Sequence, residues 1–138
     1  MNWQDLKTRQ LEKATRGQQC QRAWSEQRKG RITASNFYDV YTKVKTLLRM
    51  RGQAVKTKVS PLMARLLDPE DLSDLPSIQW GRTHVKAAGE SFFKAESAKQ
   101  SNPKLHRCGL FVSKSHPYLG GSPDNIFTCS CCGRACVE

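Results

Sequence analysis

The sequence has few acidic residues and no long apolar run. Twelve Asp and Glu stand against 23 Lys and Arg, so the 138 residues carry a formal net charge of +11. No apolar stretch approaches membrane-spanning length, and the amino terminus lacks an apolar signal core. These absences argue against membrane and secreted proteins. We expect an intracellular protein with an anionic partner, in the nucleus if the host is eukaryotic and otherwise in the cytoplasm.

The six cysteines lack the spacing of a secreted disulfide framework. Four of them fall within eight residues, at Cys129, Cys131, Cys132 and Cys136, which fits a reducing compartment. Cys129-x-x-Cys132 has a zinc-ligand spacing, which would suit a small zinc-stabilised interaction module. Strand alternation would send Cys131 and Cys132 to opposite faces. We therefore favour free thiols in a tight turn and keep zinc as the alternative.

Helices are predicted for the first hundred residues. Residues 3–28 indicate one helix with a break at Gly17, and Thr33 or Ser35 can cap a second. A loop is expected over 51–60, then a short helix from Pro61 to 67, then a long helix over 78–99 capped by Ser77. The apolar stripe of the second helix is Phe37, Val40, Tyr41, Val44 and Leu48.

Strands are predicted for the remaining residues. Residues 108–112 indicate one strand, and residues 125–129 and 134–138 indicate a hairpin around a turn at 130–133. Helices followed by strands predict an α/β or α+β fold, with the amino-terminal helices packed on a mixed sheet.

Two acidic residues flank the predicted hairpin. With a three- or five-residue loop, Ile126 would face Glu138, and the carboxylates of Asp124 and Glu138 would share one face. Their diagonal separation would be roughly 7–8 Å, whereas a four-residue loop would place them on opposite faces. Two such acids can hold one Mg²⁺ or Mn²⁺ together with water and substrate phosphate. On spacing alone, a turn aspartate and an exposed glutamate are the simpler interpretation.

Three motifs, taken in order, resemble the PD-(D/E)xK nuclease superfamily in its YqaJ-type viral recombinase and lambda exonuclease branch. The first is Arg-x-Gly-x-x-Thr-Ala-Ser at 28–35, preceded by Trp24, and the second is Trp-Gly at 80–81. The third is Gly-Ser-Pro-Asp at 121–124, followed by the hairpin and Glu138. The resemblance implies a restriction-endonuclease-like core over 22–138, incomplete at its carboxy terminus, after a helical extension at 1–21.

The resemblance also implies a function, a metal-dependent DNA exonuclease or recombination nuclease of 5′–3′ polarity. Asp124 and Glu138 would be the catalytic residues and hold Mg²⁺ or Mn²⁺. Arg28, Ser35 and Ser122 would bind a terminal 5′-phosphate, because a helix amino terminus and an arginine fork both suit phosphate. DNA would be the main partner. Family analogy adds a homo-oligomer and a single-strand annealing protein as partners.

Two departures from the family pattern bear on activity. Val85 occupies the position of the helix glutamate that binds metal in the family, and neither Glu90 nor Glu96 reaches the same place on the helix. The family's lysine lies two residues after the glutamate, whereas this sequence ends at Glu138. We therefore expect the domain to continue and these residues alone to be inactive. The alternative is a nuclease-like domain that binds DNA without cutting it.

Overall fold

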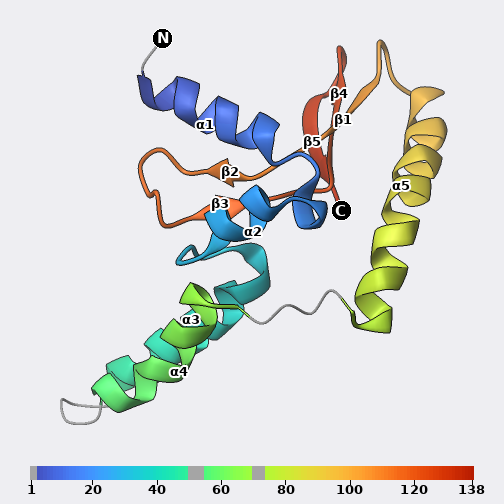
Figure 1. The fold of residues 1–138 in the computed structure, drawn as a ribbon. Helices are drawn as coiled ribbons and strands as arrows, with labels where there is room; N and C mark the ends of the chain where they lie inside the picture. Colours follow the sequence, from blue (N-terminus) through green and yellow to red (C-terminus); the bar gives the residue numbers. More distant parts are fainter. Residues whose placement is uncertain (1–2, 50–54, 70–73) are drawn as a thin grey trace.

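The computed structural model describes residues 3–49, 55–69 and 74–138. Helices come first and strands follow, which confirms the predicted α+β class (Figure 1). The helical elements are α1 (Trp3–Ala14), the 3₁₀ helix η1 (Gln18–Cys20), α2 (Arg22–Arg28), α3 (Ala34–Arg49), α4 (Val55–Leu67) and α5 (Pro76–Ser97). The strands are β1 (Lys104–Arg107), β2 (Phe111–Val112), β3 (Gly120–Gly121), β4 (Asn125–Cys129) and β5 (Gly133–Val137).

The strands form two small antiparallel sheets, so the expected mixed sheet is wrong. One sheet has the order β1-β4-β5, and β2 pairs with β3 in the other. Parallel pairing among the described residues is limited to an isolated bridge between Ile32 and Leu119. Neither β1 nor β3 was predicted.

The strand expected over 108–112 is reduced to Phe111–Val112 because the backbone before it binds a helix. The Gly109 N–H donates to a Glu12 carboxylate oxygen (3.2 Å), and the Leu110 N–H donates to Thr15 Oγ1 (2.7 Å). Leu110 and Thr15 are fully buried. A Cβ at Gly109 would overlap the carbonyl oxygen of Glu12. α1 is therefore packed closely on the segment that precedes β2.

The predicted helix over 3–28 is divided into α1, η1 and α2, with the break near Gly17 as expected. α3 begins directly after Thr33, whose backbone N–H donates to Asn36 Oδ1 (2.8 Å). A side chain at the third helical position that reaches back to this N–H is typical of a helix start. The apolar stripe of α3 is largely exposed, however, and Leu48 at its end is 82% exposed.

α4 begins at Val55, so residues 55–60 of the loop predicted over 51–60 are helical, and that part of the prediction is wrong. Pro61, which was expected to start the helix, lies inside it. Residues 51–54 of that predicted loop lie outside the described residues. α4 packs against α3, with an ion pair of 2.9 Å between Arg65 and Asp39. This packing supports a helix through a proline that has no N–H to donate. α5 begins one residue before Ser77, with Pro76 in its first turn, where proline is favoured.

α5 packs alongside the three-stranded sheet (Figure 1). The Phe127 ring in β4 meets the rings of Phe92 and Phe93 edge-on, at centroid distances of 5.7 and 6.4 Å. Gly89 is buried, and a Cβ there would lie 3.1 Å from Asn125 Nδ2. These contacts fix α5 against the start of β4. In the described parts of the chain, no helix combines the length and apolarity needed to span a bilayer.

Candidate functional site

The β4–β5 hairpin sets the relation between the two predicted acids. Ile126 pairs with Cys136 and not with Glu138, so the predicted register is wrong by two residues along β5. The turn occupies residues 130–132, because Gly133 already belongs to β5 and adopts φ +86°, which favours glycine. Extending the observed register by one pair would set Asp124 opposite Glu138, at the separation of directly paired residues, roughly 4.5–5.5 Å between Cα atoms.

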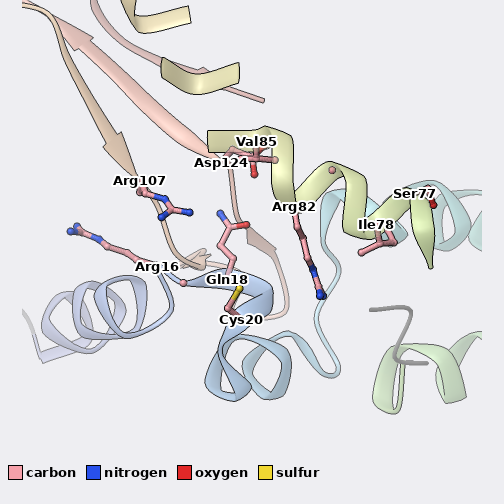
Figure 2. A pocket seen from close by; sticks show the side chains of 11 residues that line it. Arg16, Gln18, Cys20, Ser77, Ile78, Arg82, Val85, Arg107 and Asp124 are labelled. Atoms are coloured by element: carbon pink, nitrogen blue, oxygen red, sulfur yellow. The ribbon is translucent and has the colours of Figure 1, made fainter. Parts of the chain in front are cut away.

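Asp124 lines a pocket of about 300 Å³ between η1, α5 and the sheet (Figure 2). Three arginines share this lining: Arg16, Arg82 and Arg107. Val85 also lines it, so the residue at the family's glutamate position does lie in the pocket that contains Asp124. Glu138 is exposed and is not among the lining residues. The pocket therefore joins one carboxylate to a positively charged wall, which suits a phosphate.

Two side chains hold the Ser122–Asp124 segment in place. Gln18 donates through Nε2 to the carbonyl oxygens of Pro123 (3.0 Å) and Cys108 (3.1 Å). The Trp24 indole N–H donates to Ser122 Oγ at 3.0 Å. Because both contacts bridge about a hundred residues of sequence, they fix the backbone just before Asp124 against the helical half of the chain.

Arg28 lies at the centre of a network of hydroxyl groups. Its Nη2 donates to Ser35 Oγ (2.7 Å) and Thr33 Oγ1 (3.2 Å), and those two hydroxyls lie 3.0 Å apart. The guanidinium stacks on the Trp24 ring at 4.1 Å from its centroid. Burial lowers the pKa of Arg28. No carboxylate in the described ranges pairs with this cation, so it is available to an external anion.

The predicted phosphate ligands are thus connected in the structure. Arg28 bonds Ser35 directly, and Trp24 joins Arg28 to Ser122. The sequence reasoning missed Gln18, whose contacts depend on tertiary structure alone. It also missed Arg82, which lies three residues before Val85 and so on the same side of α5. The three-residue spacing from Val85 could have indicated that Arg82 lies at the same site.

The crowded cysteines are free thiols around a tight turn, as predicted, but three of them are not separated as strand alternation predicted. The Sγ atoms of Cys129, Cys131 and Cys132 lie within 4.8 Å of one another. Strand alternation does not separate Cys131 from Cys132 because both lie in the turn, where alternation does not apply. Cys136 pairs with Ile126, whereas Cys129 pairs with Gly133, so these two residues point to opposite faces of the sheet.

The helices, the small antiparallel sheets and the basic pocket around Asp124 define an α+β domain suited to a phosphate-bearing ligand. A family model described as the YqaJ-like viral recombinase domain matches residues 23–138. The chain therefore belongs to this family, which is one of recombination-associated nucleases. No curated protein and no solved structure is found to match the chain.

Proposed function

We propose that this domain is the metal- and DNA-binding part of a deoxyribonuclease that digests DNA from 5′-phosphorylated ends in recombination. The main support is the connection between the Arg28 network and the acidic residue. Ser122 bonds the indole that stacks on Arg28, and Asp124 follows two residues later. A phosphate bound at Arg28 would therefore place the adjoining DNA near the pocket of Asp124.

We further propose that residues 22–138 form part of a restriction-endonuclease-like core, with residues 1–21 as an extension. Asp124 and Glu138 would hold Mg²⁺ or Mn²⁺. Their donor set fits such ions, which use one or two carboxylates and complete their shell with water and phosphate oxygens. When bound, the ion would supply polarisation of the phosphodiester and a more acidic water. The arginines of the pocket would orient the phosphate by charge-assisted hydrogen bonds.

A second function is favoured by Val85, which lines the pocket beside Asp124 without an oxygen to offer. A domain with this substitution would bind DNA and retain little affinity for metal. Calorimetric titration of Mn²⁺ in the presence of 5′-phosphorylated duplex DNA separates the two functions. Binding that is lost in Asp124→Asn supports the nuclease, and no binding supports a domain that holds DNA without cutting it. Val85→Glu should raise Mn²⁺ affinity in either case.

The direct test is cleavage of 5′-phosphorylated linear duplex DNA by the full-length protein with Mg²⁺. We expect Asp124→Asn to reduce cleavage to background. Asp74→Asn is the matched control, because Asp74 is exposed before α5 and is not among the residues that line the pocket. Equal cleavage by the wild type and Asp124→Asn would reject the assigned role. Equal digestion of 5′-hydroxyl and 5′-phosphate ends would reject the role given to Arg28.

A further inference from the structure

The tip of the β4–β5 hairpin carries three thiols that converge on one amide oxygen. The Sγ atoms of Cys131, Cys132 and Cys129 lie 2.8, 3.3 and 3.5 Å from Gln100 Oε1. Cys131 Sγ lies 3.6 Å from Cys129 Sγ and 3.7 Å from Cys132 Sγ. Three sulfur atoms and one oxygen atom thus form a compact cluster of four possible metal ligands.

These spacings match the edges of a tetrahedral zinc site. Zn–S bonds of about 2.3 Å and Zn–O bonds of about 2.1 Å at tetrahedral angles imply S···S edges near 3.8 Å and S···O edges near 3.6 Å. The S···S distances from Cys131 to Cys129 and to Cys132 fall within about 0.2 Å of that edge. The S···O distances are shorter, as expected for thiols that donate directly to the amide. A small outward shift of Gln100 would make room for an ion.

The backbone also holds the donor atoms in place. The Cys132 N–H donates to Cys129 Sγ at 3.2 Å, which fixes the turn around that sulfur. The Ser130 N–H donates to the Ser101 carbonyl oxygen at 2.8 Å, which fixes the hairpin tip beside the segment after α5. The donors therefore come from two separate segments that the backbone already holds together (Figure 1).

We propose that Cys129, Cys131 and Cys132 bind one Zn²⁺, with the Gln100 amide oxygen or a water molecule as the fourth ligand. Thiolates select soft and borderline ions such as zinc over Mg²⁺ and Ca²⁺. Binding would displace the thiol protons into solvent. The ion would lock the turn at 130–132 and with it the register that relates Asp124 to Glu138. This site is separate from the proposed Mg²⁺ site and does not depend on nuclease activity.

The test measures zinc in protein purified with a reducing agent, before and after removal of the metal by a chelator and addition of Zn²⁺. We expect one zinc per chain after reconstitution. Co²⁺ in its place should give the charge-transfer absorption of a thiolate complex. Cys131→Ser and Cys132→Ser each remove an exposed turn thiol and should each lower zinc affinity by more than the 10–100-fold that the loss of an outer-shell partner causes.

Cys136→Ser is the matched control, because Cys136 lies in the same hairpin but on the opposite face from Cys129. It should leave zinc stoichiometry and affinity unchanged. The proposal is overturned if Cys136→Ser weakens zinc as much as Cys131→Ser does. It is equally overturned if reconstituted wild type holds no zinc, if copper(I) binds and zinc does not, or if two of the three thiols are found as a disulfide without metal.

Discussion

Replacing Thr15 with valine tests whether α1 is an integral part of the fold. The hydroxyl of Thr15 is fully buried, accepts the Leu110 N–H at 2.7 Å and donates to the Leu11 carbonyl oxygen at 2.7 Å. Valine keeps the shape but leaves the buried Leu110 N–H without an acceptor, which costs about 1–3 kcal/mol. We expect Thr15→Val to lower the free energy of unfolding by about 2 kcal/mol, roughly a thirtyfold change in the equilibrium.

The measurement is urea unfolding followed by tryptophan fluorescence. A loss of about 2 kcal/mol moves the midpoint by about 1 M when the slope is about 2 kcal/mol per M, with the slope itself unchanged. Thr15→Ser is the control, because it keeps the oxygen and removes one buried methyl group, worth about 0.8 kcal/mol. Wild-type stability in Thr15→Val, or a greater loss in Thr15→Ser, would refute the reasoning.

Three further predictions concern single contacts. Arg28→Lys should raise the Kd for a 5′-phosphorylated oligonucleotide about tenfold in fluorescence anisotropy and leave 5′-hydroxyl DNA unaffected, because lysine lacks the fork that reaches Ser35 and a phosphate together. Burial opposes ionisation of Glu12, but hydrogen bonds from Arg16 and a backbone N–H outweigh it and lower the pKa of Glu12. The free energy of unfolding should therefore include a contribution from ionised Glu12 that is fully present at neutral pH. This contribution should decline as the pH falls below the ordinary value of 4.5 and be lost below the lowered pKa. Urea unfolding of Glu12→Gln at a series of pH values should lack this pH-dependent contribution. Gly133→Ala should cost about 1–2 kcal/mol in thermal unfolding because of its φ of +86°, whereas Gly121→Ala, with no atom near its Cβ, should cost less.

The elements of the fold that are determined by residues adjacent in the sequence could be predicted, and those determined by tertiary contacts could not. Thr33 starts α3 as expected, because the helix start is fixed within four residues of sequence. Pro61 misled the prediction of α4, since proline is typical of a helix start and the packing against α3 is not visible in the sequence. Residues 108–110 have the pattern of a strand, yet the N–H groups of Gly109 and Leu110 bind Glu12 and Thr15 about ninety-five residues earlier.

The candidate site likewise contains residues that the sequence indicated and residues that it did not indicate. The resemblance indicated Arg28, Ser35 and Ser122 as a group, and the structure connects them through Trp24. The roles of these residues stay predictions until they are tested. The role of Gln18 could not be predicted from the sequence, because its amide donates hydrogen bonds to carbonyl oxygens about a hundred residues away. The expected free thiols do lie in a tight turn, but the expected separation of Cys131 from Cys132 was wrong because strand alternation does not apply to a turn.

If the half-buried guanidinium of Arg28, which donates to two hydroxyl groups, binds phosphate as proposed, it should also bind anions of the dissolved salt. Any anion that occupies this place selectively stabilises the native state, by about 2.7 kcal/mol when its concentration is a hundredfold above its Kd. Sulfate and phosphate buffers should therefore raise the melting temperature and, at the same concentration, compete with DNA ends. Melting temperatures and DNA affinities measured in different buffers would then differ because the buffer anions occupy the Arg28 site to different extents.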